Sequence, residues 1–411
     1  MILDYAKGLR NQSGGGKTPV TAGITKTVGT GGDYADLQTA LDDIYATYES
    51  DGEILTLNIL AGHVINYQTI VSGGKDLSFV KIVGEDAVTN VSLPLTTSLV
   101  VGRYDHECVF GAINESKFPI VGQSFTCVGD MTGMSQPVFM IATNNSKIQT
   151  SGTIIIKGIN GINTGYGIVA TSGSELFADV SLTVENWSMG IYLYEDAVLD
   201  SGGTTQFRLR DNDSYGLYLS SSTAWTRALS YYSGNGSGGI KCVNSKLQLY
   251  NAYVEDNFGS GLVIEEKSNV RMFTCTIQDN PKNFQVLDGS IVYATSCSFK
   301  ETVSNANGSG EMILVTNGSY LSIKQCNITF LHTGTTLLNA GIKAIFADVN
   351  ASRVSWDLRM SGQTWASSGH AMVVDAAARI SARAQEGDTA TMNQTLDVQT
   401  TKGLITQYGV Y

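Results

Sequence analysis

The chain has 411 residues, and 42% of them are apolar, which is enough for a continuous core. It carries 37 Asp and Glu against 26 Lys and Arg, a formal net charge of −11. This charge argues against nucleic acid or an anionic membrane as a partner, because both attract basic surfaces. No apolar run approaches the ~18 residues that a membrane-spanning helix needs, so membrane insertion is not expected.

Residues 1–23 are polar and glycine-rich, as in the sequence NQSGGGK over residues 11–17. Such a segment buries too little apolar surface to fold by itself, so we expect a flexible arm. It is either an unstructured terminus or a segment that attaches the protein to a larger particle. The chain begins without the basic segment and apolar core of a signal peptide, so export by that route is not expected.

Residues 33–47 predict an amphipathic helix that caps the first coil of the fold described below. Its apolar residues follow the helical spacing i, i+3, i+4, i+7 at Leu37, Ala40, Leu41 and Ile44. We expect Asp33 to be the N-cap, with Asp36 in the first turn. Asp42 and Asp43 then lie on the helix surface and do not form a catalytic pair.

Between residues 54 and 157 the predicted strands are irregular. Runs rich in apolar and β-branched residues predict them near Leu55–Ile59, Leu77–Val83, Leu99–Gly102, Val138–Ile141 and Thr153–Lys157. The sequence Asp105-His106-Glu107 contains acid–base side chains, but neighbouring residues of an extended chain point in opposite directions. We therefore expect no metal or acid–base site there.

A repeat of 22–26 residues dominates the middle of the chain. Asn, three residues, Gly and an aliphatic residue recur five times, and a sixth copy at Asn280 is one residue short. The five copies begin at Asn163, Asn186, Asn212, Asn235 and Asn257. Self-similarity at a fixed period of this length is typical of a solenoid. Each copy is punctuated by Gly and Ser and rich in β-branched and aromatic residues, so it is made of strands.

Within each copy apolar residues alternate with variable ones, as in Ile191-Tyr192-Leu193. This alternation indicates strands with one face on a core. A unit this short has no room for hairpin returns, so we expect a coil of parallel strands. The repeated Asn then lies at an inward bend, where its amide bonds the equivalent Asn of the next coil in a ladder. The Gly permits the tight backbone of that bend.

Beyond Asn280 the coils continue more loosely through Ser290–Phe299 and Ser319–Phe330, and the pattern changes from about Ala344. We expect the parallel β-helix to occupy residues 24–345. Residues 346–411 then form a distinct C-terminal β region, either a cap or a trimerisation region, because the exposed end of a solenoid invites pairing.

The six cysteines show no CxxC or other metal-ligand spacing, and we expect no metal and no cofactor. Four of them lie on the apolar side of predicted strands and are interpreted as buried thiols: Cys242, Cys275, Cys297 and Cys326. Ala252 and the last three fall at matching places in successive coils. The sequence leaves undecided whether Cys108 and Cys127 form a disulfide.

The repeat and its stacked small residues resemble the right-handed parallel β-helix of the pectin-lyase-like superfamily, over most of the chain. The phrase GGDYADLQTAL at residues 31–41 resembles the opening of many phage tailspikes and pectate-lyase-like proteins. The resemblance implies an all-β, single-stranded right-handed parallel β-helix with an N-terminal capping helix. It does not fix a function, because this fold is found in lyases, hydrolases, esterases and non-catalytic virion parts.

No GxSxG, HExxH, P-loop or dinucleotide motif occurs in a fitting context. The paired aspartates and His-Gly of polygalacturonases are missing, and the calcium-binding aspartates of pectate lyases cannot be matched. The residues that precede the repeated Asn are the candidate catalytic acids: Glu185, Asp211, Asp256 and Asp279, with Gly234 in the coil between those of Asp211 and Asp256. If the Asn points inward, this neighbour points outward, and the acids form a column.

Coils stack about 4.8 Å apart, which would place Asp256 about 5 Å from Asp279, as in a retaining glycosidase. Asp211 and Asp256, two coils apart, would lie about 10 Å apart, near the spacing of an inverting glycosidase. Like charges this close raise one pKa and leave a proton donor. The alternative is that Asp-Asn is a turn-forming pair with solvated acids.

Tyr192, Tyr218 and Lys241 occupy equivalent outward positions in three successive coils, and Tyr194 and Trp225 are expected near them. Stacked aromatic faces suit the apolar faces of sugar rings, so we predict that these three residues bind substrate. The alternative is contact with a neighbouring subunit.

An extracellular sugar-active scaffold without an export signal suggests a phage virion component that is made in the host cytoplasm and released by lysis. The prediction is therefore a homotrimeric tailspike that recognises and hydrolyses bacterial surface polysaccharide and attaches to other tail proteins through its N-terminus. The first alternative is a non-catalytic virion appendage or adhesin. A free polysaccharide lyase would need a secretion signal and a site based on calcium or on Arg and Lys, and we find neither.

Overall fold

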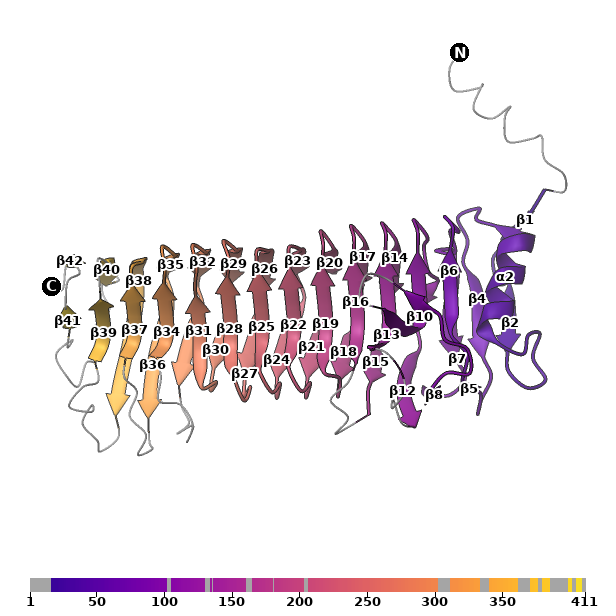
Figure 1. Cartoon of the computed structure of the whole chain (residues 1–411), viewed down its shortest axis with the longest axis horizontal. Coiled ribbons are helices and arrows are strands. Elements are labelled where there is room, and N and C mark those ends of the chain that lie inside the picture. The colour runs from indigo at the N-terminus through magenta and orange to yellow at the C-terminus, as the bar shows by residue number, and fades with distance from the viewer. Residues whose placement is uncertain are drawn as a thin grey trace, which may run out of the picture.

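In the computed structural model the chain winds into a long parallel β-helix, with α2 (Leu37–Thr47) at one end and β42 (Leu404–Tyr408) at the other (Figure 1). The structure describes residues 16–101, 105–129, 134, 136–159, 165–179, 181–202, 206–301, 311–332, 340–360, 370–375, 379–384, 398–400 and 404–408. Most of the arm predicted at residues 1–23, and the first repeat residue Asn163, lie outside these ranges.

Each regular coil contains three strands, and strands of successive coils pair in parallel. We name the three resulting sheets I, II and III in the order in which the chain passes through them within a regular coil, as in β16, β17 and β18. Sheet I contains β6 (Thr69–Ser72), β10 (His106–Ile113), β13 (Pro137–Thr143), β16 (Tyr166–Thr171), β19 (Met189–Tyr194), β22 (Tyr215–Ser220), β25 (Gly238–Val243), β28 (Ser260–Glu265), β31 (Lys282–Val286), β34 (Glu311–Thr316), β37 (Ala340–Ile345), β39 (His370–Asp375) and β41 (Val398–Thr400).

Sheet II contains β2 (Thr25–Val28), β4 (Leu55–Ile59), β7 (Val80–Gly84), β11 (Ile120–Val121), β14 (Lys147–Thr150), β17 (Glu175–Ala178), β20 (Val198–Ser201), β23 (Thr223–Thr226), β26 (Lys246–Tyr250), β29 (Asn269–Phe273), β32 (Ile291–Thr295), β35 (Tyr320–Lys324), β38 (Asp348–Met360), β40 (Arg379–Ala384) and β42. Sheet III contains β5 (Val64–Ile65), β8 (Val88–Leu93), β12 (Ser124–Gly129), β15 (Ile154–Lys157), β18 (Leu182–Glu185), β21 (Gln206–Arg210), β24 (Leu229–Ser233), β27 (Ala252–Glu255), β30 (Thr276–Gln278), β33 (Ser298–Glu301), β36 (Asn327–His332) and the second half of β38. Two short pairs lie beside the coil: β1 (Thr18–Pro19) with β3 (Tyr48–Glu49), and β9 (Val100–Val101) antiparallel to β10.

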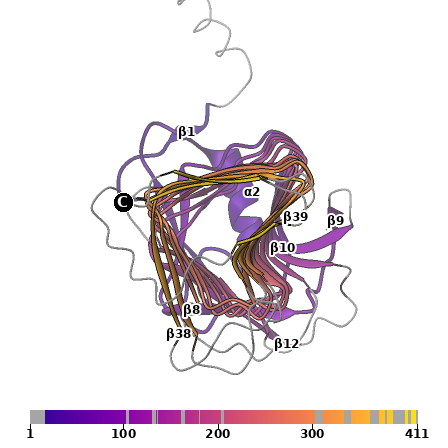
Figure 2. The ribbon, with the colours of Figure 1, turned by 90° about the vertical axis from the view of Figure 1, so that its left-hand side faces the viewer.

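The predicted capping helix is confirmed, and its N-cap is corrected. Figure 2 shows α2 across the N-terminal end of the coil, and Leu37, Ala40, Leu41 and Ile44 are its buried residues, as expected. The N-cap is Asp36, whose Oδ1 accepts from the Thr39 amide at 2.8 Å. Asp33 instead accepts from the amide and hydroxyl of Thr27. Tyr34 bridges to Val28 of β2, so the chain stays extended there and the helix begins three residues later than Asp33 would allow.

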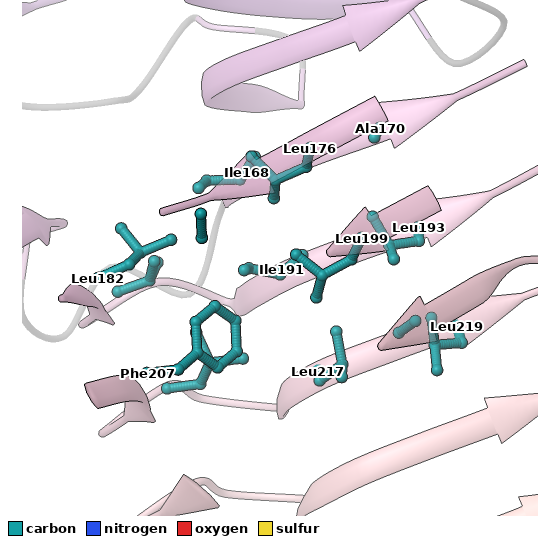
Figure 3. Close-up of a cluster of buried hydrophobic side chains, with 14 of the residues drawn as sticks. Ile168, Ala170, Leu176, Leu182, Ile191, Leu193, Leu199, Phe207, Leu217 and Leu219 are labelled. Carbon is teal, nitrogen blue, oxygen red and sulfur yellow. The ribbon is translucent and has the colours of Figure 1, made fainter. Parts of the chain in front are cut away.

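The core consists of apolar side chains stacked from coil to coil (Figure 3). Ile168, Ile191 and Leu217 occupy one register position on sheet I and are fully buried. Leu182 and Phe207 do the same on sheet III. Each such side chain contributes about 1.5–3 kcal/mol when it is removed from water, so the alternation in the sequence fixes which face of each strand points inward.

An asparagine ladder lines the corner between sheets III and I. The side-chain amide of Asn212 donates to Oδ1 of Asn235 at 2.9 Å, Asn235 donates to Asn257 at 2.9 Å, and Asn257 donates to Asn280 at 2.8 Å. Asn280 donates in turn to Asn283, so the short sixth copy extends the ladder by one residue. These side chains are buried and also satisfy backbone groups of the corner. The predicted ladder is therefore confirmed for Asn212, Asn235 and Asn257.

The repeated glycine is required for a reason other than the one expected. At Gly216 a Cβ atom would lie 2.9 Å from the Gly239 carbonyl oxygen and 3.1 Å from the Asn235 side-chain amide. Gly239 and Gly261 meet the next coil in the same way. The glycine therefore leaves room for the asparagine of the following coil, and its backbone is not in the left-handed region.

The other two corners have ladders of their own. At the corner between sheets I and II, serine hydroxyls accept from the serine amide of the preceding coil at 3.0–3.2 Å, through Ser222, Ser245, Ser268, Ser290 and Ser319. At the corner between sheets II and III, Ala252, Cys275, Cys297 and Cys326 stack as expected and are buried. All six cysteines are free thiols, and the disulfide left open between Cys108 and Cys127 is not formed.

The change of pattern near Ala344 does not interrupt the pairing of coils. β37, β39 and β41 continue sheet I in parallel register, and β38, β40 and β42 continue sheet II. The assignment of residues 346–411 to a cap or trimerisation region stays a prediction.

Candidate functional site

The outward residues of the corner between sheets III and I form a column that we call the acid column. It contains Asp211, Gly234, Asp256 and Asp279, which follow paired residues of β21, β24, β27 and β30. All four have positive φ, between 53° and 66°. Asp, Asn and Gly tolerate this left-handed conformation better than other residues do. The backbone of the corner therefore accounts for part of the preference for aspartate here.

The acids of adjacent coils perturb one another. Partial burial and then the charge of Asp279 raise the pKa of Asp256. The pKa of Glu255, the residue before Asp256, is also raised: burial is the main cause, and Asp256 and Asp279 add to it against a hydrogen bond from Gln278. Glu255, Asp256 and Asp279 therefore form one coupled acidic group, and Glu255 is a member that the sequence analysis did not select.

Glu185 does not belong to the acid column. It pairs in register with Arg210 at the end of sheet III, is 6% exposed, and accepts from Arg210 at 2.7 and 2.8 Å. Lys157 lies 3.4 Å from its other oxygen. The predicted place of Glu185 in the column is therefore wrong, because a side chain held by two cations inside a strand pair does not face the corner.

The cause is a corner that is one residue shorter in this coil. Asn186 occupies the left-handed position, with φ of 61°, which Asp211 takes in the next coil. Trp187 takes the ladder position instead: its amide donates to Oδ1 of Asn212 at 3.2 Å, and its ring is 1% exposed. Asn186 is thus outside the ladder that the sequence spacing predicts for it.

The aromatic column on the outer face of sheet I lies as expected. Tyr192, Tyr218 and Lys241 occupy one register position. The rings of Tyr192 and Tyr218 stack with centroids 5.1 Å apart at 16°, and Tyr166 stacks on Tyr192 at 5.8 Å. The Lys241 ammonium lies 5.6 Å from the Tyr218 ring and 2.8 Å from a carboxylate oxygen of Glu265.

One end of this face is covered by the chain itself. β9 pairs with the start of β10 on the outer side of the coil (Figure 2), and a second apolar cluster forms between β9 and sheet I. Tyr194 is part of this cluster and its ring lies 4.9 Å from Tyr192. His106 is fully buried nearby, 3.5 Å from the Tyr194 hydroxyl. Trp225, which was expected near Tyr192, lies instead on sheet II in register with Asp200.

A second aromatic column, on sheet III, was missed by the sequence analysis. Tyr231 and Tyr253 stack with centroids 5.2 Å apart at 14°, and the Arg208 guanidinium lies 5.4 Å from the Tyr231 ring. The signal was available, because Tyr231 and Tyr253 are 22 residues apart, one period of the repeat. Tyr253 comes two residues before Glu255. The acidic group therefore adjoins the aromatic column on sheet III, whereas Tyr218 of the column on sheet I lies two coils before it.

Over the described ranges, no group of three or more His, Cys, Asp and Glu side chains is arranged to hold a metal ion. No helix among those residues is long and apolar enough to span a membrane.

Residues 190–350 match the family model for a right-handed β-helix region. The A-module of a mannuronan C-5 epimerase from Azotobacter vinelandii is 12% identical to the chain, and the match covers 82% of this chain and 94% of that one with a TM-score of 0.37. Tailspike protein 2 from an Escherichia coli O157:H7 bacteriophage is 11% identical, covering 80% of this chain and 39% of that one with a TM-score of 0.31. The receptor-binding protein of bacteriophage Det7 is 11% identical, covering 89% and 79% with a TM-score of 0.29. No curated protein matches. The family model and the parallel coils confirm the resemblance to pectin-lyase-like right-handed β-helices as a fold.

Proposed function

We propose that this β-helix binds a polysaccharide across the corner between sheets III and I and hydrolyses it there. The observation that supports this most is the coupled group of Glu255, Asp256 and Asp279, which adjoins the stacked tyrosines on sheet III and lies two coils from Tyr218 on sheet I. Tyrosine rings bind the apolar faces of sugars, and paired carboxylates in different protonation states are what glycoside hydrolysis requires.

The proposed chemistry assigns different roles to the acids. The raised pKa makes Asp256 the proton donor to the leaving oxygen, and Glu255 is the alternative donor for the same reason. Asp279 of the next coil is the nucleophile, because coils stack about 4.8 Å apart and retaining enzymes place their carboxyl groups about 5–5.5 Å apart. In the inverting alternative, Asp211 is the base that activates water two coils away.

We further propose that the protein is a phage tailspike. It would be a homotrimer in a phage tail that recognises bacterial surface polysaccharide and attaches to other tail proteins through its N-terminus. This part rests on the resemblance of the repeat and of the opening phrase at residues 31–41. Tyr192, Tyr218 and Lys241 are proposed to bind the polysaccharide beside the acids.

The second candidate is a non-catalytic virion appendage or adhesin that binds or packs through the same face. The left-handed backbone of the acid column favours it, because Asp and Gly suit that backbone without any catalytic demand.

The test is release of reducing ends from a panel of bacterial surface polysaccharides. Asp256→Asn and Asp279→Asn keep a residue suited to positive φ, so the fold is preserved while the acid is removed. We expect each to lower kcat by about 10²–10⁴-fold, the usual contribution of acid–base catalysis. Unchanged turnover in both variants would remove these residues from the mechanism.

Asp288→Asn is the matched control. Asp288 also has positive φ, 53°, but it lies at the corner between sheets I and II. Its loss should leave turnover unchanged.

A further inference from the structure

The corner between sheets III and I contains an open depression of about 440 Å³ beside the acid column. It is lined by Asn186, Asp211, Asn212, Asp213, Gly234, Gly236 and Phe258. These residues come from four successive coils, so the depression extends along the axis of the β-helix.

Glycine in one coil creates this depression. Asp213, Gly236 and Phe258 are equivalent residues, since the amide of each donates to the carbonyl of the preceding coil's corner. At Gly236 a Cβ atom would lie 2.1 Å from the Asp213 carbonyl oxygen, and at Gly234 it would lie 2.4 Å from Oδ1 of Asp211. The floor therefore has no side chain, while the coils before and after it carry aspartates and a phenylalanine.

The C-terminal wall of the depression is Phe258, which is 78% exposed, the highest value among the exposed large apolar side chains of the described chain. Exposing an aromatic ring beside a polar hollow stabilises nothing in the fold. A ring in this setting offers an apolar face to the C–H bonds of a sugar, while carboxylate and amide groups opposite it bond hydroxyls.

The charges around the depression select among sugars. Asp211 and Asp213 are its charged lining residues. The Arg210 guanidinium is 3.9 Å from Asp211 but is already paired with Glu185 at 2.7 Å. A carboxylate on the ligand would therefore face Asp211 and Asp213, and Arg210 is already paired with Glu185 and does not offset their charge. Like charges at short range repel.

We propose that this depression is a subsite for an uncharged pyranose unit of the polysaccharide, with the sugar ring against Phe258 and its hydroxyl groups on Asp211 and Asp213. The inference rests on the proposed function and specifies its substrate class as neutral. Phe258 is two residues from Asp256. The sugar unit in the subsite is therefore next to the glycosidic bond that the acidic group would cleave.

The test measures binding of the full chain to immobilised bacterial polysaccharides, half of them neutral and half containing uronic acids. Wild type is expected to bind neutral members, and Phe258→Ala to weaken that binding about tenfold without a change in the unfolding temperature. Tyr293→Ala is the matched control, because Tyr293 is 43% exposed but lies on sheet II; its binding should equal that of wild type.

The outcomes separate the two proposals. Selective binding of uronic acid polymers, or equal binding by Phe258→Ala and wild type, overturns the subsite while polysaccharide binding itself stands. Absence of binding and cleavage across the whole panel overturns both. Weakened binding in Phe258→Ala with normal binding in Tyr293→Ala supports the subsite even if no bond is cleaved.

Discussion

The corner between sheets III and I and the corner between sheets I and II follow the same plan but carry different side chains. Both have an internal ladder, of Asn in one and Ser in the other, and both have an outward residue with positive φ. At the corner between sheets I and II that position holds a mixture of residue types: Glu195, Ser221, Asn244, Glu266, Asp288, Asn317 and Phe346. At the corner between sheets III and I it holds Asp in three of four successive coils.

The comparison shows how much the backbone explains. A left-handed corner in this fold accepts Ser, Glu and even Phe, so the conformation alone does not require aspartate. Acids occur at both corners, so the corner between sheets III and I is marked as the candidate site by the mutual perturbation of Glu255, Asp256 and Asp279 and by the tyrosine columns on its two flanking sheets.

The largest expected difference between the two corners is in stability. Asn235→Ala removes an amide that bonds Asn212, Asn257 and the Leu209 carbonyl, and it leaves several buried polar groups without partners. We expect a loss of about 3 kcal/mol, since each unsatisfied buried group costs about 1–3 kcal/mol. The measurement is the free energy of unfolding in denaturant.

Ser245→Ala is the corresponding change at the corner between sheets I and II. Ser245 accepts from the Ser222 amide at 3.0 Å and donates to the Val243 carbonyl at 2.7 Å. We expect a smaller loss, of about 1–2 kcal/mol. A loss equal to that of Asn235→Ala would show that the two ladders contribute alike.

The second expected difference between the two corners is in polysaccharide affinity. Tyr218→Ala removes the ring that stacks on Tyr192 and approaches Lys241 beside the acid-bearing corner. We expect polysaccharide affinity to fall about tenfold, or ~1.4 kcal/mol, by isothermal titration. Phe273→Ala is the control, because Phe273 stacks on Tyr250 at 5.0 Å on sheet II, away from that corner. Equal losses in both variants would contradict the assignment of the site.

The smallest expected effect is on the pH dependence of stability. Burial and neighbouring acids raise the pKa of Glu255 and Asp256 above their ordinary values of 4.5 and 3.8. The folded state therefore binds more protons than the unfolded state just above those values, and the contribution of these groups to the free energy of unfolding falls as pH rises through that range.

Glu255→Gln with Asp256→Asn should remove this contribution. Relative to wild type, the double variant is expected to gain stability as pH rises from the ordinary values, and to be equal to it below them. Asp288→Asn, at the other corner, should give a pH profile parallel to that of wild type. A wild-type profile parallel to that of the double variant would show that the acids are not coupled.

The sequence by itself determined the period, the parallel coil, the capping helix, most of the asparagine ladder and the column of Ala252, Cys275, Cys297 and Cys326. In a solenoid each residue contacts its equivalent one period away, so a pattern repeated along the chain maps directly onto contacts in space. The serine ladder and the Tyr231–Tyr253 stack obey the same rule, and their spacing was equally visible in the sequence.

Only the tertiary structure decided the details of the corners. The length of each turn sets which residue enters the ladder, and one residue fewer in one coil placed Trp187 there and turned Glu185 toward Arg210. The depression at Phe258 likewise depends on glycines in a single coil being flanked by larger residues in its neighbours. A repeat fixes what stacks on what, whereas the shape of an outer surface depends on how three or four unequal coils combine.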